Sequence, residues 1–282
     1  MLIFDTQEAI RAYIKSITTD KTSIGFVPTM GALHLGHLSL IKESLQQNSF
    51  TIVSIFVNPT QFNNPEDLAK YPRTLESDIV KIKTINTEIV VFAPSVANIY
   101  ENQIHSERFD FDGLENQMEG KFRPGHFDGV GTIVRRLFEI ITPTRAYFGE
   151  KDFQQLQIIR KMVQKNNLPV EIIQCPIYRE SNGLAMSSRN ERLSPNEREE
   201  AAVIFQTLKK VKADFNQKTQ AEITTWVHHV FEKNPSISLE YFQIADEATL
   251  LPSENEQNNY KYRAFIAVFI NNIRLIDTIS LN

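Results

Sequence analysis

Two histidines lie three residues apart where a short apolar run gives way to an amphipathic segment. His34 and His37 stand on either side of Gly36 in this segment. Residues three apart face the same side of a helical turn, so both imidazoles can donate hydrogen bonds to one developing phosphoryl charge. A helix start adds unpaired N–H groups and a partial positive charge. The pattern therefore predicts phosphoryl-transfer chemistry at this turn.

Three other interpretations of this turn are open. It could be a polar turn whose histidines have no chemical role. The spacing from Gly31 to Gly36 imitates a phosphate-binding P-loop, but His37 and Leu38 stand where lysine and serine or threonine are needed. A metal site would need a third ligand, and none follows His34 and His37 at helical spacing.

Neutral amides follow the next apolar run. Asn58 and Gln61 come after residues 51–57, and amides bind hydroxyl and carboxylate oxygens without adding charge. From chemistry alone, an ordinary turn built on Asn and Pro is slightly favoured. The polar, proline-bearing residues 63–72 are a candidate mobile lid.

Two later loops carry groups suited to phosphate. In the first, Gly149 permits close backbone approach and Lys151 is a point charge. Asp152 could accept a ribose hydroxyl, although capping a helix is the commoner use of such a residue. In the second loop, residues 187–189, two hydroxyls and a guanidinium can wrap a triphosphate. For that loop, a linker of ordinary turn residues is about equally favoured.

The elements that position these groups follow a simple pattern over about the first 175 residues. Near-continuous β-branched runs alternate with amphipathic segments, which predicts a doubly wound, Rossmann-like parallel sheet covered on both faces. Asp5 and Glu8 have the spacing of a capping box at the first helix, which continues through residue 17. The expected strands are 23–28, 51–57, 88–93, 146–148 and 170–175, and the other expected helices are 37–47, 75–86, 131–141 and 153–166.

The pattern changes after about residue 177. Ser194 and Glu197 mark a strong helix start, and helices are expected over 195–213 and 220–233. Strands are expected over 239–244, 264–269 and 275–278, with a tight turn at Asn271 and Asn272, and residues 253–259 are polar enough for a solvated loop. The sequence thus predicts a larger α/β domain over residues 1–177 and a smaller C-terminal α+β domain over residues 178–282.

Two motifs carry a family resemblance. His34–His37 resembles the His-x-Gly-His motif of the nucleotidylyltransferase and class I aminoacyl-tRNA synthetase superfamily, with Leu35 at its variable position. Residues 186–189 resemble the Lys-Met-Ser-Lys-Ser-type loop, which pairs with that motif across one nucleotide. The longer string PTMGALHLGHLSL, residues 28–40, resembles the pantothenate synthetase family in particular. The resemblance covers nearly all of residues 1–192 and is thin beyond them.

The resemblance implies ATP-dependent condensation of (R)-pantoate with β-alanine through a pantoyl-adenylate, with Mg²⁺ and with release of AMP and pyrophosphate. Residues 1–177 would bind nucleotide and pantoate, and residues 178–282 would close over the ATP site. His34 and His37 would stabilise the pentacovalent charge, and either could act as general acid. The implied substrate-binding residues are Asn58, Gln61 and Gln155. The implied ATP-binding residues are Met30, Gly31, His34, Gly36, His37, Gly149, Glu150, Lys151, Asp152, Tyr178, Met186, Ser187, Ser188 and Arg189.

Three assignments are weaker. Arg123 and His126 match a family segment near the substrate, but they rank below the residues above because a surface or structural role is common for such residues. The metal ligands stay undetermined. Glu76 and Asp78 are candidates, although acidic residues are common at helix starts.

Bulk composition limits the function classes. The 282 residues have a formal net charge of −4, which gives no general attraction to nucleic acid or anionic membranes. We expect a soluble, cytoplasmic enzyme with neither a secretory signal nor a membrane span. The single cysteine, Cys175, is expected to be a small core residue at a strand end. The family implies a homodimer.

Two rival functions remain. Another nucleotidylyltransferase of the superfamily would usually need extra cationic groups for a phosphorylated acceptor, whereas the amides here suit a small hydroxy acid. An RNA-binding synthetase relative would need a basic stripe, which the sequence lacks.

Overall fold

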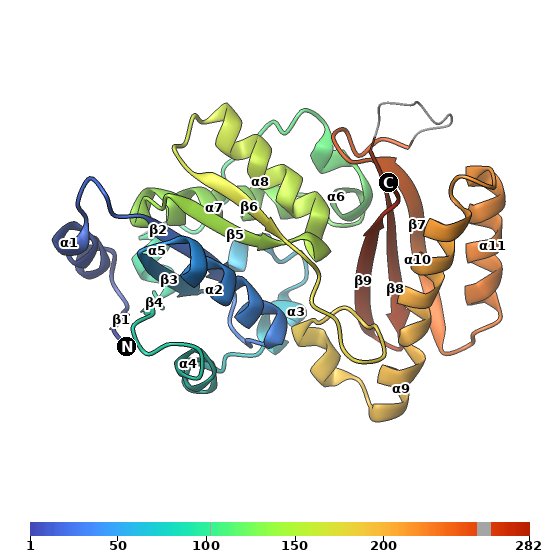
Figure 1. Ribbon diagram of the computed structural model, residues 1–282, viewed down its shortest axis with the longest axis horizontal. Helices are drawn as coiled ribbons and strands as arrows, with labels where there is room; N and C mark the ends of the chain where they lie inside the picture. Colours follow the sequence, from blue (N-terminus) through green and yellow to red (C-terminus); the bar gives the residue numbers. More distant parts are fainter. Residues whose placement is uncertain (102, 253–260) are drawn as a thin grey trace. The chain divides into compact units, whose positions relative to one another are not determined.

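Six parallel strands form the larger sheet of the computed structural model, which describes residues 1–101, 103–252 and 261–282 (Figure 1). The strand order is β1-β4-β3-β2-β5-β6. After β2, the chain adds β3 and β4 on one side of β2 and then β5 and β6 on the other, so the direction of winding reverses between β2 and β5. Ligands bind at such a switch point in open α/β sheets. The strands are β1 (Ile3–Phe4), β2 (Ile24–Thr29), β3 (Phe50–Ile55), β4 (Val90–Phe92), β5 (Arg145–Gly149) and β6 (Glu171–Cys175).

Helices cover both faces of this sheet because neighbouring strand residues point to opposite sides. Val27 and Val53 belong to a buried cluster with Ile41 of α2 (Leu35–Gln47). On the other face, the ring of Phe26 lies 6.2 Å from that of Phe138 in α7 (His126–Ile141). The structure therefore confirms the expected doubly wound α/β fold.

The helices expected over the first 175 residues are present, with differences at their ends. The short helices over 65–70, 96–100 and 118–122 were not expected. Thr6, rather than Asp5, caps α1 by accepting the N–H of Ala9 at 3.2 Å. Helix α7 begins at His126, five residues before the expected start. The other elements are α1 (Gln7–Ile17), η1 (Pro59–Gln61), α3 (Pro65–Lys70), α4 (Leu75–Lys83), α5 (Val96–Tyr100), η2 (Leu114–Asn116), α6 (Met118–Phe122), η3 (Glu150–Asp152) and α8 (Phe153–Lys165).

The chain separates into two compact units. The first comprises Met1–Glu115, Glu119–Gly149 and Gln155–Cys175, and the second comprises Asn116–Met118, Glu150–Gln154 and Pro176–Asn282. The polar stretch 253–259, expected to be a loop, lies outside the described residues.

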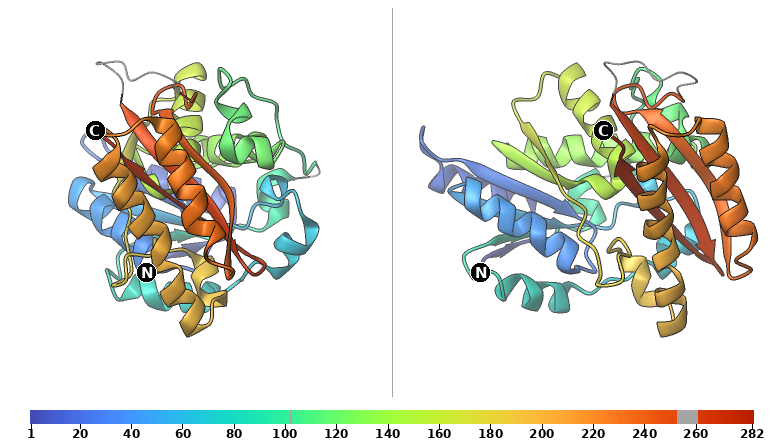
Figure 2. Two further views of the ribbon diagram at one scale, coloured as in Figure 1. Left: turned by 90° about the vertical axis from the view of Figure 1, so that its right-hand side faces the viewer. Right: turned by 45° about the vertical axis from the view of Figure 1, so that its right-hand side comes forward.

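The second unit contains a three-stranded antiparallel sheet with α10 and α11 on one side of it (Figure 2). The Ser194 capping box is confirmed, since Glu197 accepts the N–H of Ser194 at 2.7 Å. The expected single helix over 195–213 is wrong: it is interrupted at Ala201, because α9 buries none of its residues whereas α10 turns in to pack on the sheet. The elements are η4 (Ser188–Arg192), α9 (Pro195–Glu200), α10 (Ala202–Asp214), α11 (Gln220–Glu232), β7 (Ile237–Asp246), β8 (Tyr262–Ile270) and β9 (Ile273–Ser280).

A two-residue hairpin joins β8 to β9. Ile270 pairs with Ile273, which leaves Asn271 and Asn272 as the turn. Asn271 has a φ of 50°, as the first residue of such a tight turn requires. The expected turn is confirmed. Among the helices of the described parts of the chain, none combines the length and hydropathy that a membrane span needs.

Candidate active site

The turn between β2 and α2 brings the two histidines together. His34 is the N-cap of α2, and its backbone N–H donates to Nδ1 of His37 at 3.4 Å. The two ring centroids lie 4.0 Å apart. Because Nδ1 of His37 accepts this bond, the neutral ring carries its proton on Nε2, the nitrogen that could donate to a phosphoryl oxygen. The structure therefore confirms that both imidazoles share one side of the helix start.

A buried carboxylate shapes this turn from α4. Asp78, which is 0% exposed, accepts the backbone N–H groups of Ala32 at 2.9 Å and Leu33 at 2.7 Å. Gly31 and Ala32 both have positive φ, 80° and 49°, and a Cβ on Gly31 would come within 3.1 Å of the Asp78 carboxylate. Lys81 donates to the carbonyl of Leu33 at 2.6 Å. Helix α4 thus fixes the backbone on which the histidines stand.

The carboxylate of Asp78 is therefore committed to the turn, which removes it from the candidate metal ligands. Its Oδ2 also accepts the hydroxyl of Thr74 at 3.2 Å. Glu76, the other candidate, is exposed in the first turn of α4. Within the described ranges, no three His, Cys, Asp or Glu side chains gather as a metal ion would require.

The amides after β3 are buried and bonded to each other. Asn58 is 1% exposed and Gln61 is 8% exposed. The Nδ2 of Asn58 donates to Oε1 of Gln61 at 3.2 Å, and Nε2 of Gln61 contacts the sulfur of Met30 at 2.9 Å. The substrate candidates Asn58 and Gln61 therefore adjoin Met30, which lies just before the histidine turn.

The segment that contains Arg123 and His126 also contacts Gln61. Nδ1 of His126 lies 2.8 Å from the backbone carbonyl of Gln61, and Nη2 of Arg123 donates to the same oxygen at 3.4 Å. A Cβ on Gly129 would come within 2.4 Å of the carbonyl of Thr60. Only glycine therefore lets α7 pack this closely on η1. The sequence analysis missed this requirement although Gly129 lies within the segment that matches the family.

Two other predicted residues lie in this unit. Gln155 is partly buried in the first turn of α8. Gly149 ends β5, and a Cβ there would meet open space, so packing within the protein does not explain the glycine.

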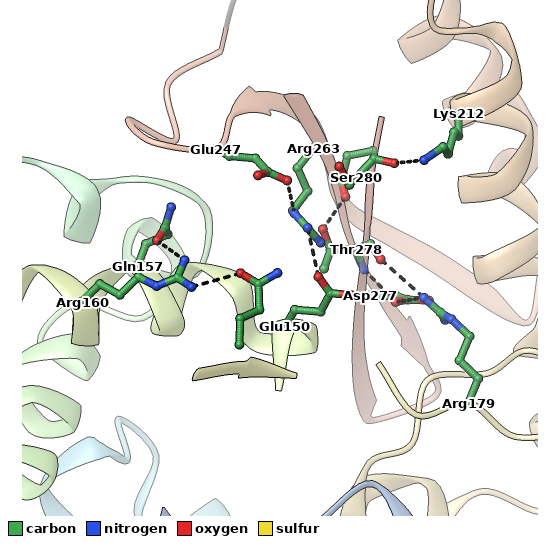
Figure 3. A network of polar contacts seen from close by, with 12 residues as sticks. Glu150, Gln157, Arg160, Arg179, Lys212, Glu247, Arg263, Asp277, Thr278 and Ser280 are labelled. Carbon is green, nitrogen blue, oxygen red and sulfur yellow. Dashed lines mark hydrogen bonds and ion pairs between the residues drawn. The ribbon is translucent and has the colours of Figure 1, made fainter. Parts of the chain in front are cut away.

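The loop after β5, Glu150–Gln154, belongs to the second unit. A buried arginine of the same unit binds this loop (Figure 3). Arg263, with a side chain 3% exposed, pairs with Glu150 at 3.1 Å and with Glu247 at 2.8 Å. Its guanidinium also lies over the ring of Phe153 at 4.1 Å. These contacts fix η3, which carries Lys151.

The ammonium of Lys151 is largely shielded, with a side chain 17% exposed, and lies 3.4 Å from the carboxylate of Asp152. This placement leaves Lys151 as a fixed cation on η3 and Asp152 as its exposed partner. Both residues lie in the short 3₁₀ helix η3.

The predicted phosphate loop has defined backbone contacts. Met186 donates its N–H to the carbonyl of Tyr178 at 3.0 Å. The hydroxyl of Ser187 accepts the N–H of Arg189 at 3.2 Å and caps η4, which begins at Ser188. Tyr178 is 41% exposed. The loop is therefore a short hairpin followed by a capped 3₁₀ helix.

A buried ion pair anchors this hairpin to β9. Arg179 donates to both oxygens of Asp277, at 2.6 and 3.0 Å, and its guanidinium lies over the ring of Phe205 at 3.7 Å (Figure 3). Burial raises the pKa of Asp277, while hydrogen bonding to Arg179 opposes that rise. The ion pair therefore ties the start of the hairpin to β9. Cys175 is confirmed as a buried strand-end residue.

Comparisons with known proteins agree over the whole chain. The family model for Pantoate-beta-alanine ligase matches residues 2–280. Pantothenate synthetase of Flavobacterium psychrophilum is 62% identical over 281 residues, covering 100% of both chains. That of Christiangramia forsetii is 52% identical over 282 residues, again covering 100% of both. The similarity therefore extends well beyond residue 192, where the motifs alone left it thin.

Solved structures give the same result. A crystal structure of pantothenate synthetase from Thermus thermophilus has a TM-score of 0.91 at 37% identity, covering 100% of this chain and 99% of the other. Pantoate-beta-alanine ligase from Francisella tularensis, complexed with Beta-gamma ATP and beta-alanine, has a TM-score of 0.77 at 35% identity, covering 100% and 98%.

Proposed function

Since the chain belongs to the pantoate–β-alanine ligase family, it joins pantoate to β-alanine in an ATP-dependent, AMP-forming reaction, and we propose which residues carry each step. In the first step, a pantoate carboxylate oxygen attacks the α-phosphorus of ATP and pyrophosphate leaves. In the second step, the β-alanine amine attacks the acyl carbon of pantoyl-adenylate, an amide bond forms, and AMP leaves with the former carboxylate oxygen.

The histidine pair supports the first step. His34 and His37 present two rings on one side of the α2 start, 4.0 Å apart. Hydrogen bonds from imidazoles to the equatorial phosphoryl oxygens strengthen as charge builds up in the transition state. This arrangement is the single observation that carries the assignment of His34 and His37 as the catalytic residues.

We assign the remaining groups by their chemistry. Lys151 is a fixed cation that is suited to binding phosphate. Asp152, beside it, is suited to accepting a ribose hydroxyl. Ser187, Ser188 and Arg189 supply hydroxyls and a guanidinium for the triphosphate. The full proposed ATP-binding set is Met30, Gly31, His34, Gly36, His37, Gly149, Glu150, Lys151, Asp152, Tyr178, Met186, Ser187, Ser188 and Arg189.

Pantoate is assigned to the buried amides. Asn58 and Gln61 lie at the carboxyl end of β3, next to Met30, where an open α/β sheet binds its ligands. Gln155 completes the proposed set. Neutral donors and acceptors suit a small hydroxy acid better than a phosphorylated acceptor, which agrees with the family.

Mg²⁺ fits the proposed ATP-binding residues as an ion that binds together with ATP. The described residues offer no cluster of protein ligands, and Mg²⁺ is usually held by phosphate oxygens, waters and one or two carboxylates. When bound, Mg²⁺ would neutralise phosphate charge.

Three broader features are also proposed. The domains 1–177 and 178–282 would work together, the second closing over ATP, which suits the water-sensitive mixed anhydride. The enzyme would work in the cytoplasm, where ATP is made, and as a homodimer, as the family resemblance implies. Light scattering of the purified protein would test the dimer, and a monomer mass would contradict it.

A pyrophosphate-exchange assay tests the reaction sequence. Radiolabel should pass from pyrophosphate to ATP with pantoate present and β-alanine absent. Exchange without any acid, or only with a phosphorylated acceptor, would contradict the two-step scheme.

A further inference from the structure

A chain of buried hydrogen bonds leads from Tyr100 to Gln61. Tyr100 ends α5 and is 2% exposed. Its hydroxyl donates to Oδ1 of Asn58 at 2.6 Å, and Nδ2 of Asn58 donates to Oε1 of Gln61 at 3.2 Å. Each member of the chain is buried, so water competes little for these bonds.

The orientation of both amides follows from one backbone group. Nδ2 of Asn58 also donates to the carbonyl of Gly129 at 3.1 Å, and a carbonyl can only accept. Asn58 must therefore point its NH₂ toward Gly129 and Gln61, and its oxygen toward Tyr100. Gln61 must therefore direct its oxygen toward Asn58. The NH₂ group of Gln61 then points the other way, toward Met30.

Tyr100 is placed to stabilise that orientation. The hydroxyl of Thr60 lies within 3.0 Å of the Tyr100 hydroxyl and 3.2 Å of Oδ1 of Asn58, so Tyr100 is the closer donor to Asn58. The guanidinium of Arg136 lies over the Tyr100 ring at 4.8 Å. Burial raises the pKa of Tyr100, which keeps the hydroxyl protonated as a donor.

We propose that Tyr100 is a positioning residue for pantoate, acting through Asn58 to make Gln61 present N–H donors to the substrate. Gln61 then selects an acceptor, such as the carboxylate or a hydroxyl oxygen of pantoate. The inference rests on the proposed role of Gln61.

The test is steady-state kinetics of Tyr100→Phe, which keeps the ring and removes the hydroxyl. Loss of one buried hydrogen bond should raise the KM for pantoate roughly three- to tenfold. The KM for ATP and kcat should stay within about twofold, a split that general unfolding would not produce. In an Asn58→Ala background, Tyr100→Phe should add no further rise.

Tyr147→Phe is the matched control. Tyr147 is also fully buried in the first unit, and its hydroxyl accepts from Nδ2 of Asn48 at 2.7 Å. This substitution removes an equivalent bond outside the proposed pantoate site, so the KM for pantoate should not change.

Two results separate the possible failures. A raised KM for pantoate in Gln61→Ala but a normal one in Tyr100→Phe would overturn this inference alone. A normal KM in Gln61→Ala would overturn the proposed site itself. If Tyr100→Phe does not fold, Asn58→Ala breaks the same chain of hydrogen bonds, and an unchanged KM for pantoate in that variant would overturn the inference.

Discussion

The carboxylate of Asp78 accepts the backbone N–H of Leu33 at 2.7 Å, across 45 residues of sequence. With the bond to Ala32, this contact makes α4 the support of the turn that carries both histidines. A residue considered for metal binding thus has a different task, which is to hold a left-handed stretch of backbone in place.

Replacing this carboxylate should destabilise the protein. In Asp78→Asn, an NH₂ group would face the N–H of Ala32 or Leu33, leaving a buried donor unsatisfied. The free energy of unfolding should fall by roughly 1–3 kcal/mol, as measured by urea denaturation. Glu76→Gln, an exposed change in the same helix turn, should alter it by less than about 0.5 kcal/mol. Equal stability of the two variants would contradict the role of Asp78.

His37→Ala should impair chemistry rather than nucleotide binding. Removing a donor to the transition-state charge should slow single-turnover formation of pantoyl-adenylate by about 10²–10³-fold, while the Kd for ATP changes little. Rapid quench and equilibrium titration would measure the two quantities. His105→Ala, at an exposed position of the same unit, should react at the normal rate. A normal rate in His37→Ala would remove that residue from the mechanism.

Arg263→Met should leave two carboxylates without their shared cation. Glu150 and Glu247 would face each other near a buried methionine, and removing one partner of a buried ion pair costs about 3 kcal/mol or more. Thermal unfolding would show the loss. Arg274→Met is the control, because Arg274 pairs with Glu240 on the same sheet but is 20% exposed; it should cost clearly less. The reverse order would count against a special role for Arg263.

The capping box at α9 should make stability depend on acid pH. Hydrogen bonds from the backbone and side chain of Ser194 lower the pKa of Glu197 below its usual 4.5. A lowered pKa in the folded state means that the stabilisation is complete above pH 4.5 and disappears as the pH falls through the folded pKa. Wild type should therefore exceed Glu197→Gln in stability at pH 7, with the gap closing in acid. Glu199→Gln, in the same helix but outside the capping box, should match wild type in stability at pH 7.

The sequence predicted the parts of the fold that repeat a local signal. The strands β2 and β3 are largely apolar runs, and Ser194 with Glu197 is a complete capping motif. Strand β1 was missed because two residues are too few to show a period. The split at Ala201 was missed because tertiary packing, rather than propensity, ends α9.

The site shows the same division. His34 and His37 were found because their chemistry and spacing lie within four residues. The contacts of Tyr100 with Asn58 and of Asp78 with Leu33 join residues more than 40 positions apart, and no spacing rule reaches that far. Local chemistry and spacing therefore identified the histidines, and the family resemblance identified the amides proposed to bind pantoate. The residues that orient these groups required the structure.

Because Cys175 is buried, its thiol can serve as a natural probe of local opening in the protein. It is the chain's one thiol, 4% exposed, at the end of the edge strand β6. An alkylating reagent can reach it only when that edge of the sheet opens. The labelling rate therefore measures local opening without any added reporter, and its dependence on ATP or pantoate would show which ligand keeps the sheet closed.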